Sequence, residues 1–204
     1  MADKKKVTFA AREPAYRVFA NELKHTKFSR KDESDERAPQ YVILPTGAAA
    51  NRIHFCGILT EKKKYDNSMG NETLKYKVYV NDGTGNFTLY FSTYQQNSLQ
   101  QISKINNVPC IVSVIGKPSV YNTPDGKAFV SIRVEDIRVV SADERNVWVI
   151  DTIKQTYGRI VKMELNECDD PVVKEARELY KANMSSYKQM IIDVTNDLAL
   201  RTSA

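Results

Sequence analysis

Residues 73–91 read TLKYKVYVNDGTGNFTLYF, and this stretch decides the fold. From residue 74 to residue 80 apolar and polar side chains alternate, as they do on a strand that buries one face. The run NDGTG at residues 81–85 supplies turn-forming residues, and NFTLYF at residues 86–91 reads as the next strand. We therefore expect a β-hairpin with one face on a core and the other face outside.

Further strand segments lie on both sides of this hairpin. Residues 53–60 (IHFCGILT) precede it, and their central glycine indicates a bulge or a sharp bend. Residues 110–115 (CIVSVI) and 128–140 follow it, with a TPDG turn between them. Residues 95–106 have the apolar spacing of a short helix, which the proline at position 109 ends.

Three strands, one helix and two further strands follow one another in the order of an OB-fold barrel. Residues 61–72 form either a long loop or an extension of the hairpin between the first two strands. Residues 45–50 form a connecting loop before the barrel. We expect a mainly β chain, a five-stranded OB-fold barrel with a helical extension. The OB-fold domain spans residues 41–140.

The segments outside the barrel differ from it in their periodicity. Residues 13–28 have the spacing of a short amphipathic helix, and residues 29–39 are almost without apolar side chains. We therefore assign residues 1–40 to an N-terminal arm and flexible linker. Residues 141–204 form C-terminal amphipathic helices, the first capped by Ser141 and the second, over residues 171–200, capped by the aspartate before it.

The charge of the chain is moderately basic and unevenly placed. Lys and Arg outnumber Asp and Glu by 30 to 25, a formal net charge of +5. Residues 52–140 carry 11 basic and 7 acidic side chains, whereas residues 141–204 carry 9 and 11. This distribution weakly favours a polyanion as the partner of the barrel.

No apolar run reaches the roughly 18 residues of a membrane helix, and no apolar signal segment follows residues 1–6. The three cysteines are far apart in sequence, which fits a reducing compartment. We expect a soluble, unexported protein in the cytoplasm, associated with the nucleoid and without a membrane partner.

Enzyme and metal chemistry find little support. The eight glycines are dispersed, and phosphate-binding, dinucleotide-binding and nucleophile-elbow motifs are all missing from the sequence. His54 and Cys56 share a strand face, but no third ligand lies nearby in sequence. Asp82 is explained as a turn residue, and Glu135 and Asp136 point to opposite strand faces. We expect a non-enzymatic protein with no cofactor, no metal and no small-molecule substrate.

The outward residues of the hairpin suit single-stranded nucleic acid, because bases stack on aromatic rings and phosphates bind ammonium groups. OB barrels bind in the groove that the second and third strands form with the loops after the first and fourth strands. The alternative is that these lysines and tyrosines only cover a solvated face. The predicted nucleic-acid-binding residues are Lys62, Lys63, Lys64, Lys75, Lys77, Tyr79, Tyr90, Lys117 and Tyr121.

Several segments resemble a known family. Residues 50–60 (ANRIHFCGILT), 76–91 and 114–140 are similar to the middle subunit of replication protein A, and more closely to the archaeal replication protein A-associated proteins. Residues 13–23 and 45–52 share this resemblance. It implies a subunit that binds single-stranded DNA in replication, recombination and repair, with stacking near Tyr90 and at Val120 or Tyr121.

The resemblance also implies partner subunits that bind through the helix after the barrel. The apolar stripe of that helix is longer than a small barrel can cover, so we expect a subunit interface there. The second helix either folds back on the stripe or joins an intersubunit bundle. Two other functions stay open: a scaffold subunit with little DNA contact, and an RNA-binding OB protein of translation. The predicted interface residues are Val147, Ile150, Ile153, Tyr157 and Ile160.

Overall fold

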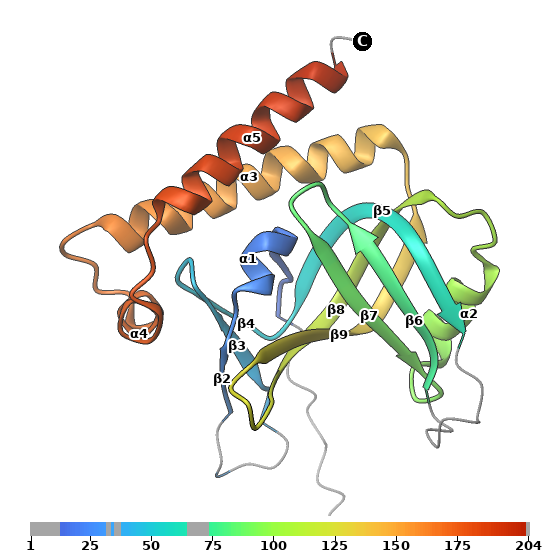
Figure 1. Ribbon diagram of the computed structural model, residues 1–204, viewed down its shortest axis with the longest axis horizontal. Helices are drawn as coiled ribbons and strands as arrows, with labels where there is room; N and C mark the ends of the chain where they lie inside the picture. Colours follow the sequence, from blue (N-terminus) through green and yellow to red (C-terminus); the bar gives the residue numbers. More distant parts are fainter. Residues whose placement is uncertain (1–12, 32–33, 35–37, 65–73, 203–204) are drawn as a thin grey trace, which may run out of the picture.

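The computed structural model describes residues 13–31, 34, 38–64 and 74–202. In this part of the chain five strands form a closed barrel, in the pairing order β5-β6-β7-β9-β8 with β8 returning to β5 (Figure 1). The predicted five-stranded OB-fold barrel with a helical extension is confirmed. The strands are β5 (Ile53–Lys64), β6 (Leu74–Asn81), β7 (Asn86–Ser92), β8 (Cys110–Asn122) and β9 (Ala128–Val139).

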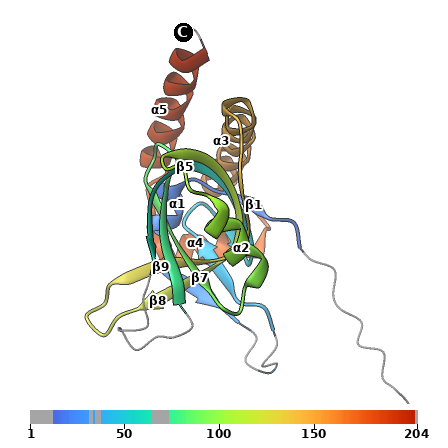
Figure 2. The ribbon, with the colours of Figure 1, turned by 90° about the vertical axis from the view of Figure 1, so that its right-hand side faces the viewer.

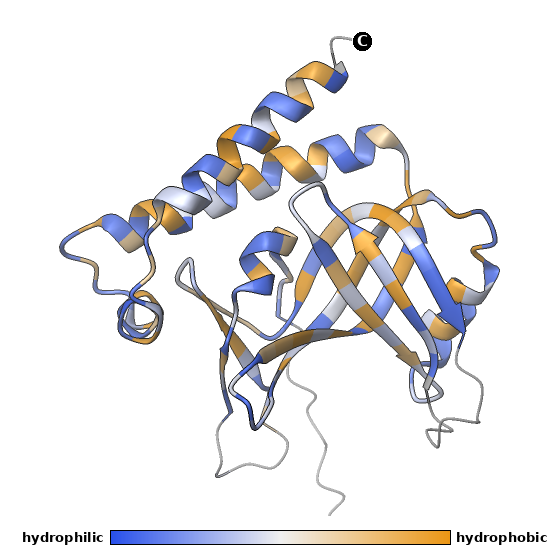
Figure 3. Ribbon diagram, viewed as in Figure 1, coloured by the Kyte–Doolittle hydropathy of each residue, from blue (hydrophilic) through white to orange (hydrophobic). Residues whose placement is uncertain are grey.

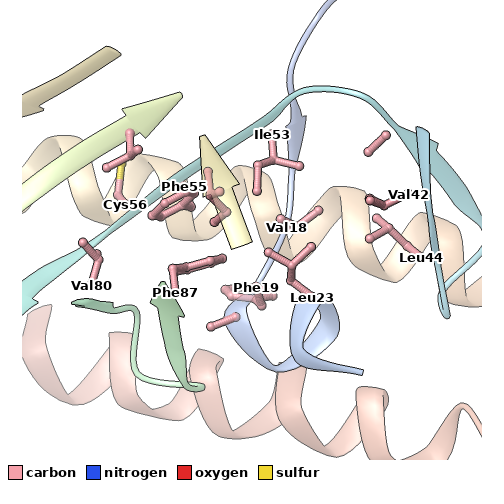
Figure 4. Close-up of a cluster of buried hydrophobic side chains, with 14 of the residues drawn as sticks. Val18, Phe19, Leu23, Val42, Leu44, Ile53, Phe55, Cys56, Val80 and Phe87 are labelled. Carbon is pink, nitrogen blue, oxygen red and sulfur yellow. The ribbon is translucent and has the colours of Figure 1, made fainter. Parts of the chain in front are cut away.

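The barrel core comes from the alternation that the sequence shows. Phe55 of β5 stacks on Phe87 of β7 with ring centroids 3.8 Å apart (Figure 4). The same alternation is visible along the strands as interleaved hydrophobic and hydrophilic positions (Figure 3). Helix α2 (Gln96–Lys104) lies across one end of the barrel, where Ile102 is fully buried (Figure 2). The other buried hairpin residues are Val78, Val80, Leu89 and Phe91.

Gly57 allows β5 to pass close to β6. A Cβ atom at this position would lie 2.5 Å from the carbonyl oxygen of Asn81 and 2.9 Å from Cγ1 of Val80. The pairing of β5 with β6 also shifts between Leu59 and Glu61, which is a β-bulge. The predicted irregularity of this strand is present, but the bulge lies at Thr60, three residues after the glycine.

The helix predicted over residues 13–28 is wrong. This segment contains β1 (Tyr16–Arg17), which pairs in parallel with β5, and a helix α1 of only five residues (Ala20–Lys24). Phe19 is fully buried and meets the ring of Trp148 edge to face, with centroids 5.6 Å apart. Packing on the core therefore overrides the local helical spacing, as tertiary context often does.

A small second sheet stands beside the β8–β9 hairpin (Figure 1). It pairs β2 (Phe28–Arg30), β3 (Tyr41–Leu44) and β4 (Ala48–Ala50) in antiparallel order, so the predicted loop over residues 45–50 contains a strand. The amide of Asn122 donates to the carbonyl of Lys27 over 3.4 Å, which joins the hairpin to this sheet. The domain limits at residues 40 and 140 stay predictions.

Three helices follow the barrel. The predicted cap of α3 (Ala142–Glu164) is confirmed, because the Ser141 hydroxyl accepts from the Glu144 amide in a capping box. The predicted single helix over residues 171–200 is wrong. It divides into α4 (Pro171–Tyr180) and α5 (Ser185–Thr202), and the chain turns at Lys181, whose φ is +47°. Helix α5 folds back across α3 (Figure 1). None of the helices in the described residues is long and apolar enough to cross a membrane.

A buried ion pair joins the N-terminal arm to α3. Nη2 of Arg159 lies 2.9 Å from Oε1 of Glu22, and the Glu22 side chain is fully buried. The hydroxyl of Thr46 donates to the same carboxylate, and Arg159 also donates to the carbonyl of Arg17. The charged groups are therefore satisfied inside the fold, as burial requires.

Candidate nucleic-acid interface

The outer face of β6 and β7 carries a lysine between two tyrosines. Lys77 lies directly opposite Tyr90 in the strand pairing. Its Nζ atom lies 5.3 Å from the ring centroid of Tyr79 and 5.7 Å from that of Tyr90, within the range of cation–π attraction. All three side chains are half-buried, so each keeps an accessible surface. The structure thus brings together these three predicted site residues.

The strand pairings extend this cluster across the whole barrel. Lys63 of β5 pairs with Lys77, Tyr90 pairs with Arg133 of β9, and Arg133 pairs with Lys117 of β8. Side chains opposite each other on neighbouring strands share a face. We call these five residues, Lys63, Lys77, Tyr90, Arg133 and Lys117, the basic row.

The β8–β9 hairpin adds a pair of exposed aromatic rings. Tyr121 lies opposite Phe129, and their exposed fractions are 64% and 56%. Residues two apart on a strand share a face, so this aromatic pair lies on the same face of the hairpin as Lys117 and Arg133. Accessible aromatic rings therefore lie at two places along the basic row, at Tyr90 and at the aromatic pair.

Lys62 differs from its neighbours. Its Nζ donates to the carbonyls of Ile102 and Ile105, over 2.9 and 2.8 Å, at the end of α2. Burial lowers the pKa of this ammonium group. Lys62 and Tyr76 share a cation–π contact of 5.2 Å. The structure therefore uses Lys62 to hold α2 against β5, on the opposite strand face from Lys63.

The remaining predicted lysines differ in their position on the strands and in their exposure. Lys62, Lys63 and Lys64 lie on β5, so the predicted loop begins later than residue 61, and its residues 65–73 lie outside the described part. Lys64 is exposed on the strand face that Lys62 shares, and Lys75 is half-buried at a bulge in the β6–β7 pairing. Lys63 is exposed and 3.0 Å from Glu61, whose carboxylate raises the pKa of this lysine.

Arg133 and Phe129 were not in the sequence prediction. Both belong to the strand predicted over residues 128–140, where alternation alone does not say which side faces the groove. The register with Tyr90 and Tyr121 decides it. The sequence did contain a signal for both residues. If the β8–β9 hairpin closes at its TPDG turn, Phe129 lies opposite Tyr121 and Arg133 lies opposite Lys117.

His54, Ser113 and Cys56 form a small polar cluster between β5 and β8. Nε2 of His54 lies 3.0 Å from the Ser113 hydroxyl and 3.9 Å from Sγ of Cys56. Burial raises the pKa of the Cys56 thiol, which disfavours the reactive thiolate. The described residues contain no cluster of three or more side chains able to hold a metal ion. Asp82 accepts hydrogen bonds from its own turn and from the Ala20 amide, so its role is structural.

The predicted interface on α3 is partly exposed and partly internal. Val147, Ile150 and Tyr157 have exposed fractions of 61%, 42% and 55%. Ile153 is half-buried. Ile160 is fully buried within the chain itself, so it does not belong to the exposed stripe. Helix α5 packs on α3 while Val147, Ile150 and Tyr157 stay exposed.

No family model and no curated protein sequence matches the chain. Among solved structures, it is similar to a chain of the Stn1–Ten1 complex of S. pombe, at 12% identity over 73% of this chain and 96% of that one, with a TM-score of 0.53. It is also similar to a replication protein A heterotrimer bound to single-stranded DNA, at 17% identity over 72% and 98% of the two chains, with a TM-score of 0.48. A third is the mitochondrial single-stranded DNA-binding protein Rim1 of S. cerevisiae, at 15% identity, 44% and 95% coverage and a TM-score of 0.35.

The fold is an OB fold. The strand order of the barrel and the likeness to the S. pombe structure both show it.

Proposed function

We propose that this chain binds single-stranded DNA as the OB-fold subunit of a replication protein A-like complex acting in replication, recombination and repair. The observation that carries the proposal is the basic row, which crosses all five barrel strands in register. The sequence resemblance supports the assignment to a replication protein A-like complex.

The row offers the two kinds of contact that a single strand needs. Bases stack on Tyr79, Tyr90 and the aromatic pair Tyr121 and Phe129, while phosphates meet the cations between them. These contacts read neither base edges nor a duplex groove, so binding tolerates many sequences. The protein shelters the strand without catalysis.

Titration of a labelled oligothymidine, followed by fluorescence anisotropy, tests the proposal. Tyr90→Ala should cost about 1–3 kcal/mol of binding free energy, because one stacking surface is lost. Tyr157→Ala is the matched control, since this tyrosine is exposed on α3, outside the basic row, and its loss should leave the affinity unchanged. Wild-type affinity of the Tyr90 variant at an unchanged melting temperature would contradict the proposal.

Salt dependence tests the phosphate contacts in the same assay. Each neutralised phosphate of a single strand contributes a slope of about 0.7 in log Kd against log salt, so the four cations predict a slope of about 3. Competition with an RNA of the same sequence separates DNA binding from the translation alternative, which uses the same stacking chemistry.

A second candidate is a scaffold subunit that holds partner subunits and touches little DNA. The exposed stripe on α3 favours it, because an apolar strip of this length is normally covered in an assembly. Salt-independent or undetectable binding to single strands, together with a stable complex through α3, would support the scaffold function over DNA binding.

A further inference from the structure

A cavity of about 450 Å³ adjoins one end of the basic row. Its lining includes Lys117 and Arg133 together with the polar side chains of Gln40, Asn51 and Ser119. Among the described residues no carboxylate lines it. We call this cavity the phosphate pocket.

Lys117 and Arg133 have no hydrogen bond or ion pair within the described part of the chain, although they lie directly opposite each other on β8 and β9. Like charges in such a cross-strand pair repel each other and destabilise the sheet. An anion held by both side chains would relieve this repulsion, and it would form charge-assisted hydrogen bonds with both.

The position of the pocket relates it to the strand path. Arg133 borders the pocket and pairs with Tyr90, so the pocket begins where the stacking surface of β7 ends. On another side the chain at Ala38, Pro39 and Gln40 forms its wall. A single DNA strand that runs from Tyr90 over Arg133 therefore meets residues 38–40 of the chain rather than open solvent.

We infer that the phosphate pocket binds the terminal phosphate of a single strand whose neighbouring base stacks on Tyr90. This inference rests on the proposed function, because it assigns the end of the same binding site. A terminal phosphate monoester carries a charge of about −1.5 to −2 at neutral pH, whereas an internal diester carries a single charge. Two unpaired cations match the monoester, and the wall formed by residues 38–40 closes the path beyond it.

Oligothymidines of equal length test the inference when they carry a phosphate at the 5′ end, at the 3′ end or at neither end. One of the two phosphorylated strands, but not the other, should bind about tenfold more tightly than the unmodified strand. Equal tightening by both phosphates would show a general charge effect and would overturn the inference. Hydroxyl-ended strands that bind as tightly as both phosphorylated ones would overturn it as well.

The variant Lys117→Gln/Arg133→Gln should bring the ratio of the two affinities to one. Lys63→Gln/Lys64→Gln is the matched control, since it also removes two positive charges. Lys63 is the far end of the basic row, and Lys64 is its neighbour on β5. The control should weaken all strands together and keep the ratio. Tyr90→Ala should likewise lower every affinity and leave the preference for one end. Loss of the ratio in the control as well would contradict a local site.

Inorganic phosphate provides a test of the pocket that does not depend on DNA binding. Titrated into the isotope-labelled full chain at constant ionic strength, it should shift the amide resonances of Asn51 and Ser119, which line the pocket, in the wild type but not in the double variant. If no strand binds and phosphate produces these shifts, the proposed function fails and the anion pocket stands. If strands bind through Tyr90 and neither a terminal nor a free phosphate is recognised, the pocket fails and the proposed function stands.

Discussion

His54 is the residue whose ionisation the fold perturbs most clearly in a partly accessible place. Burial, together with the positive charges of Arg17 and Arg138, lowers its pKa from 6.5 to about 4. Glu144 and Asp151 of α3 line the surface pocket that His54 also lines. The neutral imidazole is therefore the form that the folded state accepts.

This ionisation predicts a pH dependence of stability. Between the ordinary pKa of 6.5 and the folded value of about 4, the unfolded chain binds more protons than the folded one. The stabilising contribution of neutral His54 is present above pH 6.5 and is lost as the pH falls toward 4, by about 2 kcal/mol. Urea unfolding at pH 7.0 and 4.5 measures it. His54→Gln should flatten the difference, and an equally steep loss in this variant would refute the assignment.

The buried pair of Glu22 and Arg159 is a second residue-level determinant of stability. Arg159→Met leaves a carboxylate that is fully buried and without a counter-ion, which should cost about 3–5 kcal/mol of unfolding free energy. Arg30→Met is the control, because its pair with Glu175 is solvent-exposed and worth about 0–1 kcal/mol. Urea denaturation of both variants gives the comparison, and equal losses would contradict the assigned role of the buried pair.

Single residues of the interface were predictable only where alternation within one strand already says which side chains face outward. Alternation along residues 74–80 placed Lys77 and Tyr79 outside, and the structure agrees. Arg133 lies opposite Lys117 in the β8–β9 hairpin, so the register of that hairpin was needed to place it on the binding face, and its pairing with Tyr90 is a long-range contact that no local pattern contains. The sequence places Lys62 in the loop after the first strand and therefore predicts a DNA contact. In the structure Lys62 lies on β5, and its ammonium group caps the end of α2, a segment about 40 residues away in sequence.

At the level of elements, the strands were easier to predict than the segments that pack on them. The barrel strands show strict alternation because each buries one face, and this pattern survives in the sequence. Residues 13–28 have helical spacing, yet β1 joins β5 and Phe19 enters the core. The energy that decides this arrangement comes from the barrel and from Trp148, which lie far away in sequence.

The close pairing of β5 with β6 predicts a strong effect at one glycine. Gly57→Ala should lower the unfolding free energy by about 2–3 kcal/mol, because the new Cβ would overlap the backbone of Asn81. Gly158→Ala is the matched control: this helical glycine has open space around it, so alanine should stabilise α3 by about 0.5–1 kcal/mol. Thermal unfolding of the two variants should therefore shift in opposite directions, and a stabilised Gly57 variant would disprove the close approach.

The whole molecule presents two distinct surfaces. The basic row and the aromatic pair lie on the barrel strands, whereas the apolar stripe lies on α3, which packs against β1, β5 and β8. Helix α5 crosses α3 and buries its own Tyr187, Met190 and Ile191, so the C-terminal helices do fold back (Figure 1). This packing leaves Val147 and Tyr157 uncovered, so the proposed DNA-binding face and the proposed subunit interface lie on different parts of the chain.

The uncovered stripe predicts how association can be broken without unfolding. Ile150→Asp/Tyr157→Asp places carboxylates at exposed positions, so the unfolding free energy should change by no more than about 1 kcal/mol, whereas binding of partner subunits should be lost because the charges become buried and unpaired in the complex. Ile160→Asp differs in kind: it buries a charge inside the chain and should unfold the protein. Size-exclusion chromatography with light scattering, on the chain alone and with its co-purifying subunits, distinguishes these outcomes. A wild-type protein that stays monomeric and brings no subunit with it would show that the stripe is not an interface, and single-strand binding by that monomer would then make the barrel face sufficient for function.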